Sequence, residues 1–225
     1  DYDEAERLYR RALELDPDNV TNTGNLANFM KLVRKDDDEA ERLYRRALEL
    51  DPDDAKATGN LALFLYEVRK DYNEAERLFP RALELDPQDI VNTTNFAEFL
   101  LVRNQLGKAQ KLLGQAWELN NRERTDTAAA IALYWCLLAR MGEQDDTPGL
   151  ARLKFLLEEG FERSGWKFDG FLSAIDERLL ADDQAFYSAL AAAILDPEKV
   201  REMERFERWE KIEPTPIDQS WQMEG

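Results

Sequence analysis

The feature that most constrains this chain is an internal repeat. The opening segment DYDEAERLYRRALELDPD, residues 1–18, returns almost unchanged at 36–53 and again at 71–88. Both steps are 35 residues (36 − 1 and 71 − 36), and a weaker fourth copy places Ala109 34 residues after Ala75. Self-similarity at such a period is typical of proteins built from stacked supersecondary units. The fold must therefore be one that grows by adding units.

Each copy has the pattern of an amphipathic helix. An Asp opens each of the first three copies and can cap the helix, a Glu follows three residues later, and Asp-Pro ends the pattern. A second helical pattern lies between the copies, at 20–35, 55–70 and 90–105. Two short helices cannot bury their apolar faces alone, so the units are expected to stack into a right-handed solenoid.

The pattern N-L-A…A-E-x-L-Y-x-x-A-L-E-L-D-P resembles the tetratricopeptide repeat family over residues 1–120. The resemblance implies an all-α, right-handed α-solenoid of tetratricopeptide-type helix pairs, which here starts at the second helix of a repeat. The 35-residue step exceeds the family norm of about 34. We expect the additional residue in the turn between the two helices. Pro80 replaces the Arg of earlier copies, so helix 72–85 is expected to be bent or loosened there.

The sequence of residues 121–212 predicts a helical region that no longer follows the 35-residue repeat. A helix apolar nearly all round is expected at 126–141, and another after Thr147-Pro148; this pair could be a degenerate fifth repeat. Further helices are expected at 170–181, 183–195 and 197–211, as a C-terminal helical cap. The last carries an apolar stripe formed by Val200, Met203, Phe206 and Trp209.

Residues 213–225 form a Pro-containing tail that we expect to be docked. Ile217, Trp221 and Met223 are its candidate anchors. Two docking sites stay open, the chain's own C-terminal helices and the groove of a neighbouring molecule.

Charge and composition exclude several classes of function. The net charge of −17 argues against nucleic-acid and anionic-membrane partners. The chain has no histidine, which excludes His-dependent catalysis and His-containing zinc sites within it. Cys136, the single cysteine, is expected to be a buried apolar residue. We therefore expect no catalytic residue, no cofactor and no metal, and a location in a reducing cytoplasm.

The family resemblance also implies a binding surface, because the first helix of each repeat lines a concave groove in that family. Asn25, Asn60 and Asn95 recur there at steps of 35 residues. They could bond backbone groups of neighbouring helices, contact a ligand, or do both. A full clamp for a terminal carboxylate is not expected, since Lys and Arg are missing beside them. By the same implication, the remaining groove residues are Asn28, Lys31, Lys56, Leu63, Tyr66, Glu98 and Leu101.

These features predict a protein–protein interaction scaffold that binds a peptide or helix in the groove. The alternative is a regulatory or sensing module of a larger signalling protein or enzyme. The first helix would leave one flank open, because no partner helix precedes it. We expect further repeats upstream or packing against another chain there, and self-association through this helix or the tail is a further possibility.

Overall fold

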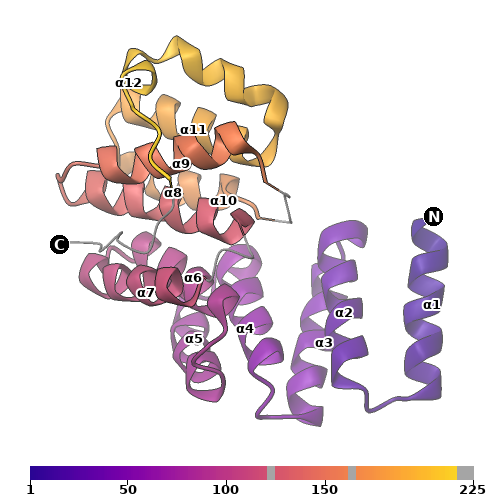
Figure 1. Cartoon of the computed structure of the whole chain (residues 1–225). Helices are drawn as coiled ribbons and strands as arrows, with labels where there is room; N and C mark the ends of the chain where they lie inside the picture. Colours follow the sequence, from indigo (N-terminus) through magenta and orange to yellow (C-terminus); the bar gives the residue numbers. More distant parts are fainter. Residues whose placement is uncertain (121–124, 162–165, 217–225) are drawn as a thin grey trace. The chain divides into compact units, whose positions relative to one another are not determined.

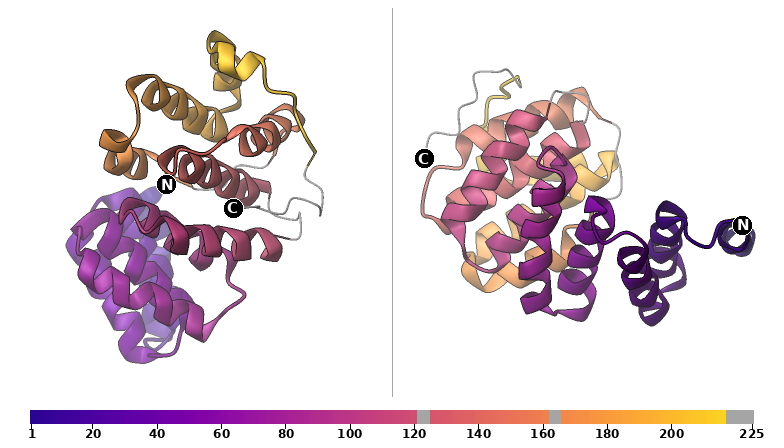
Figure 2. Two further views of the ribbon diagram at one scale, coloured as in Figure 1. Left: turned by 90° about the vertical axis from the view of Figure 1, so that its left-hand side faces the viewer. Right: turned by 90° about the horizontal axis from the view of Figure 1, so that it is seen from below.

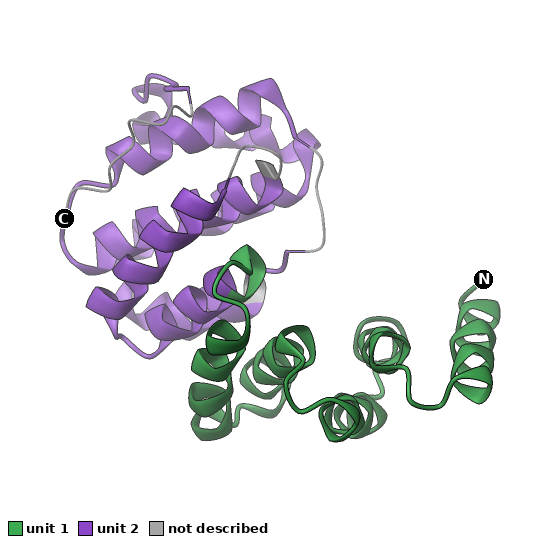
Figure 3. Ribbon diagram, turned by 60° about the horizontal axis from the view of Figure 1, so that its bottom comes forward, with its two compact units in different colours: residues 1–92 green, residues 93–225 purple. Residues whose placement is uncertain are grey.

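The computed structural model describes residues 1–120, 125–161 and 166–216. Every regular element within these ranges is a helix, and the helices pack in pairs, which confirms the prediction of an all-α fold built from helix pairs. None of the described helices combines the length and the apolar character that crossing a membrane requires. The chain falls into two compact units, residues 1–92 and 93–225 (Figure 3).

Unit 1 is a row of helices in which each element packs against the next (Figure 1). We call α2–η1 and α4–η2 the A helices of this unit and α1, α3 and α5 its B helices. Their bounds are α1 Tyr2–Leu15, α2 Val20–Phe29, η1 Met30–Arg34, α3 Asp37–Leu50, α4 Ala55–Phe64, η2 Leu65–Arg69 and α5 Tyr72–Leu85.

The expected caps fix where the B helices begin. Asp36 accepts a hydrogen bond from the backbone N–H of Glu39, and Asp71 accepts one from Glu74. Each bond satisfies one of the N–H groups that a helix start leaves without an intrahelical partner. The prediction of an Asp cap in each of the first three copies is therefore confirmed, with Asp1 bonded to the N–H of Asp3.

The additional residue of the 35-residue step lies inside the A helices, not in the turn after them as expected. Both A helices end in a π-helical turn, η1 and η2. At the end of η1, the Lys35 N–H donates to Met30 O, which spans five residues, one more than an α-turn, and the Asp36 N–H donates to the same oxygen. Helix α6, where the step is 34, ends instead with Arg103 N–H donating to Phe99 O, four residues earlier.

Helix α5 runs without a break through Pro80. Proline has no N–H and crowds the preceding turn, so this position costs the helix stability. Packing offsets the cost, since Ala75, Phe79 and Ala82 on the same helix are fully buried. The expected bend at Pro80 stays a prediction.

Unit 2 continues the helical arrangement and holds most of α6. Its helices are α6 Ile90–Val102, α7 Leu106–Leu119, α8 Thr125–Met141, α9 Thr147–Glu159, α10 Asp169–Ile175, η3 Asp176–Arg178, α11 Ala181–Leu195, η4 Pro197–Arg205 and α12 Glu207–Glu210. Helix α8 is buried on nearly all sides from Ala128 to Cys136, as its apolar sequence predicts. The sequence-based boundaries at 120/121 and 212/213 stay a prediction.

The prediction of one continuous helix over residues 197–211 is wrong. Residues Pro197–Arg205 form a 3₁₀ helix, Phe206 is extended, and only Glu207–Glu210 return to α-helix. The apolar stripe explains the difference, because Val200, Met203, Phe206 and Trp209 are spaced by three. A 3₁₀ helix has three residues per turn and aligns such a stripe on one side, whereas an α-helix rotates it away.

A buried ionic cluster holds this last segment against the rest of unit 2. Arg208 bonds to Asp146 and to Asp183, and Arg140 reaches the other oxygen of Asp183 at 2.6 Å. The Tyr187 hydroxyl also donates to Asp146. Two arginines thus neutralise two carboxylates that are 4% and 8% exposed.

Part of the predicted tail docking is visible beyond this cluster. Lys154 donates to the carbonyls of Trp209 and Ile212, and Thr215 N–H donates to Ala151 O of α9 at 3.0 Å. The segment up to Thr215 therefore lies on the chain's own helix. The proposed anchors Ile217, Trp221 and Met223 lie outside the described residues.

Candidate partner-binding surface

The A helices of unit 1 expose a stripe of mainly polar side chains. On α2, Asn25 is exposed and Asn28 is half-buried. On α4, Lys56 is exposed while Asn60 and Leu63 are half-buried. Residues spaced by three or four lie on one face of a helix, so each set forms one continuous stripe. The caps Asn19 and Asp54 fix the starts of these helices by accepting from the N–H groups of Asn22 and Ala57. We call the two stripes together the A-helix face.

Two polar contacts fix side chains at the edge of this face. The Tyr44 hydroxyl donates to Asn28 Oδ1 at 2.6 Å, which leaves the Asn28 NH₂ group to point elsewhere. Lys31 forms an ion pair of 2.6 Å with Glu67 and so joins the two A helices. Burial raises the pKa of Tyr44, and the nearby Glu67 carboxylate raises it further. Tyr44 therefore stays a neutral donor.

Three side chains on the A-helix face keep their hydrogen-bonding groups unused. Among the residues that the structure describes, Asn25, Asn60 and Lys56 make no side-chain hydrogen bond or ion pair. Asn25 and Asn60 thus form no ladder of bonds between helices, which was one of the two expectations for them. Amides and an ammonium in this arrangement can donate to peptide carbonyls or a carboxylate. Ligand contact by these residues stays a prediction.

The structure buries the other four predicted groove residues. Tyr66 is 2% exposed and packs near the ring of Tyr72 in α5. Glu98 accepts a hydrogen bond from the Tyr134 hydroxyl of α8. Leu101 is fully buried, and its carbonyl accepts from Arg178. Asn95 is 7% exposed. The surface open to a partner is therefore carried by α2 and α4.

Asn92 makes the kind of interhelical bond that was expected of the three recurring asparagines. Its Nδ2 donates to Ala55 O of α4, and its side chain lies against Gly59. A Cβ at Gly59 would stand 1.9 Å from Asn92 Oδ1, so any larger residue there would have to displace the Asn92 side chain. The equivalent Gly24 meets nothing within 4 Å, because the residue at the place of Asn92 is the smaller Ala57. Sequence analysis missed Asn92, and the recurring glycine gave no signal for it, since Gly24 has no such contact.

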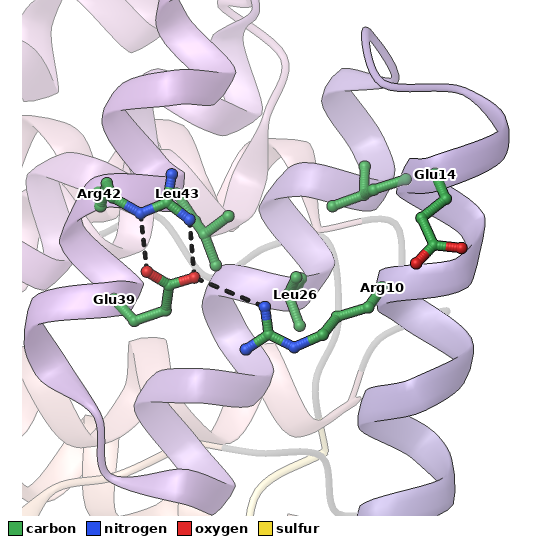
Figure 4. Close-up of a pocket in the computed structure, with 7 residues that line it drawn as sticks. Arg10, Glu14, Leu26, Glu39, Arg42 and Leu43 are labelled. Atoms are coloured by element: carbon green, nitrogen blue, oxygen red, sulfur yellow. Dashed lines mark hydrogen bonds and ion pairs between the residues drawn. The ribbon is translucent and has the colours of Figure 1, made fainter.

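A shallow pocket lies between the B helices α1 and α3 (Figure 4). Its volume is about 330 Å³, and Leu26 of α2 is among the apolar residues that line it. The charged residues around it neutralise one another, since Glu39 pairs with Arg42 at 2.7 Å and with Arg10 at 3.9 Å. The sequence-based site includes none of these residues. The pocket offers room for one apolar side chain and no set of groups for acid–base chemistry.

Comparisons with known families agree with the repeat that the sequence and the helix pairs show. Three sequence models of the tetratricopeptide repeat match the chain, one over residues 69–134, one over 43–77 and one over 1–21 and 24–58. The chain belongs to the tetratricopeptide repeat family. A search of curated protein sequences finds no match.

Solved structures of tetratricopeptide repeat proteins and related factors share the fold. PilW, described as a widely conserved type IV pilus biogenesis factor, is 20% identical with a TM-score of 0.60, over 91% of this chain and 84% of PilW. PilF of Pseudomonas aeruginosa is 23% identical with a TM-score of 0.57, over 91% and 89%. YrrB, described as having an unusual peptide-binding site, is 17% identical with a TM-score of 0.52, over 89% and 94%. Identities this low show the fold alone.

Tetratricopeptide repeat proteins are protein-interaction scaffolds that bind proteins or peptides, and the fold is typically non-catalytic. Membership of this family gives the general class of function, protein binding. The residues that contact a partner have to be argued from the A-helix face itself.

Proposed function

We propose that this tetratricopeptide repeat protein binds an extended or helical peptide of a partner protein along the A-helix face. The observation that carries the proposal is the set of unused groups on that face, the amides of Asn25 and Asn60 and the ammonium of Lys56. Leu63 beside them supplies apolar area, and Leu32 in η1 is 44% exposed. Polar groups that fix orientation beside apolar side chains suit the recognition of a peptide.

Site-specific photo-crosslinking tests this proposal and identifies the partner in the same experiment. A photoreactive amino acid is placed at Asn25 or Asn60, and as a matched control at Arg46, a B-helix residue whose side chain is 45% exposed. Each variant is irradiated in an extract of the source cells, and the crosslinked proteins are identified by mass spectrometry. We expect one protein to crosslink strongly from positions 25 and 60 and weakly from 46. Equal crosslinking from all three positions would contradict the proposal.

We also propose that the role is non-catalytic. The chain has no histidine, and burial raises the pKa of the Cys136 thiol, which makes it a poor nucleophile. The test is the substitution Cys136→Ser in a variant that stays folded. Loss of a catalytic activity in this variant would contradict this part of the proposal.

A cytoplasmic location is a further proposal. It rests on the use of cysteine, since the given sequence has one, which is buried and not in a disulfide. Fractionation of the source cells with an antibody against the chain tests it, and recovery outside the cytoplasm would contradict it.

A further inference from the structure

The connection between α9 and α11 is much longer than the repeat requires. After each of the first three copies, four residues lead to the next helix, for example 51–54 between α3 and α4. Between α9 and α11 lie 21 residues (181 − 159 − 1), because α9 ends at Glu159 and α11 begins at Ala181. Helix α11 then resumes the pairing of helices by packing against η4. Residues 166–178 of this connection, which hold α10 and η3, are thus an insertion in the row, and we call them the insert.

The insert lies against α8. In Figures 1 and 2 its helix α10 is beside α8, and the rings of Phe168 and Phe171 meet the Tyr134 ring edge-on, with centroids 5.9 and 5.0 Å apart. The hydroxyl of the same tyrosine donates to Glu98 of α6. Glu98 stands at the place of Leu63, which is part of the A-helix face 35 residues earlier. The insert therefore packs on the tyrosine that covers a predicted groove residue.

Arg178 joins the other end of the insert to α6. Its guanidinium donates to the carbonyls of Leu101 and Val102, at 2.9 and 2.8 Å. Both carbonyls belong to the last turn of α6, where a helix leaves carbonyl groups without intrahelical partners and carries a partial negative charge. Leu101 is another of the predicted groove residues. The insert thus spans α6 and α8 on the side where the repeat predicted a groove.

The insert has the pattern of an amphipathic helix that fits a groove. Phe168, Phe171 and Ile175 are spaced by three and four residues and are at most 1% exposed, whereas Ser173 and Ala174 are exposed. Helix α10 is only seven residues long and begins without a side-chain cap. A helix this short is not stable by itself, so contact with α6 and α8 holds it in place. Segments of this kind open at a lower free-energy cost than the core.

We propose that the insert is a built-in ligand of the groove formed by α6 and α8, and that a short amphipathic helix of a partner protein takes its place. The partner helix carries the insert's own pattern. It has two aromatic residues three positions apart, an aliphatic residue four positions later and an arginine three positions after that. Its aromatic rings pack on Tyr134, and its arginine takes over the carbonyls at the end of α6.

The proposal extends the binding proposed for the A helices to unit 2, but it stands on the contacts of the insert alone. Crosslinking at Asn25 and Asn60 can therefore succeed while this proposal fails, and the reverse.

Hydrogen exchange of the natural chain tests whether the insert leaves its groove while the rest of unit 2 stays folded. We expect the backbone amides of α10 and η3 to exchange about tenfold or more faster than those of α8 and α11, because the insert opens alone. Exchange of all four elements at one rate would overturn the proposal, since the insert would then be a permanent part of the core.

A synthetic peptide that copies residues 166–180 tests the replacement by a partner helix. Its affinity for the full chain is measured by calorimetry. We expect Arg178→Ala in the chain to strengthen binding about tenfold, because the insert competes within the same chain and loses its two bonds to α6. Glu177→Ala, at the exposed neighbouring residue, is the control and should leave the affinity unchanged.

Two further readouts show where the peptide binds. The substitution F171A in the peptide should weaken binding to the Arg178→Ala chain, because it removes the ring that lies nearest to Tyr134. The bound natural peptide should speed hydrogen exchange in α10 and leave α8 protected. The proposal is overturned by equal affinities of the two folded chain variants, by no binding to the Arg178→Ala chain, or by a bound peptide that leaves exchange in α10 unchanged.

Discussion

Lys31 and Glu67 form an ion pair of 2.6 Å across 36 residues of sequence, and it joins the two A helices of unit 1. The two side chains are 12% and 27% exposed, so water screens the pair only in part. We expect Lys31→Met to lower the free energy of unfolding by about 1 kcal/mol. Urea denaturation measures this change.

A second ion pair of the same length but greater exposure is the control for that experiment. Lys211 and Glu207 also lie 2.6 Å apart, but their side chains are 72% and 80% exposed. Lys211→Met should therefore leave stability unchanged. An equal loss from both substitutions would show that the ion pair between the A helices has no special role.

Gly24 and Gly59 occupy the same place in successive A helices, yet they should respond in opposite ways to alanine. Gly59→Ala puts a Cβ into the Asn92 side chain and should destabilise the chain by roughly 1–3 kcal/mol. Gly24→Ala meets open space within a helix and should stabilise it by up to about 1 kcal/mol. Thermal melting of the two variants checks the prediction, and a shift of the same sign in both would contradict it.

Pro80→Arg should raise the melting temperature, because it restores a helical N–H and removes a steric clash. Interior proline costs roughly 3 kcal/mol in a helix, of which local packing recovers part. Gly114→Arg is the control at the same place in the fourth copy, where a Cβ meets nothing within 4 Å, and should gain about 1 kcal/mol or less. An unchanged or lower melting temperature for Pro80→Arg would refute the prediction.

Arg208→Ala should destabilise unit 2 strongly. It leaves Asp146 without its arginine partner and Asp183 with Arg140 alone, and both carboxylates are buried. Removing one partner of a buried pair costs about 3–5 kcal/mol. Arg205→Ala is the control, because Arg205 is exposed on the same segment and its guanidinium lies over the Phe206 ring. Comparable losses in the two variants would argue against the cluster.

The repeat made the order and pairing of the helices predictable, since caps, Asp-Pro ends and apolar spacing agree in the first three copies. The π turns at Met30–Arg34 and Leu65–Arg69 were not predicted. A one-residue insertion can enlarge a helical turn or lengthen a loop, and sequence spacing is the same in both cases. The 3₁₀ helix at Pro197–Arg205 had a usable signal, the strict spacing of three in its apolar residues.

The candidate site was predictable only where side chains face away from other helices. Asn25, Lys56 and Asn60 are on the surface, as their place in the repeat implies. Glu98 lies instead against Tyr134, from a helix that follows the regular copies and whose packing the repeat does not specify. The Asn92–Gly59 contact also escaped prediction, because it joins residues of two different repeats.

The most direct test of the central claim uses the partner found by crosslinking and measures its affinity for the full chain by calorimetry. Asn25→Ala combined with Asn60→Ala should weaken binding about tenfold or more, since each lost hydrogen bond contributes roughly 0.5–1.5 kcal/mol. Arg46→Ala combined with Arg81→Ala, on the B helices, should leave the affinity unchanged while both double variants stay folded. Equal affinities for the two double variants would contradict binding along the A-helix face.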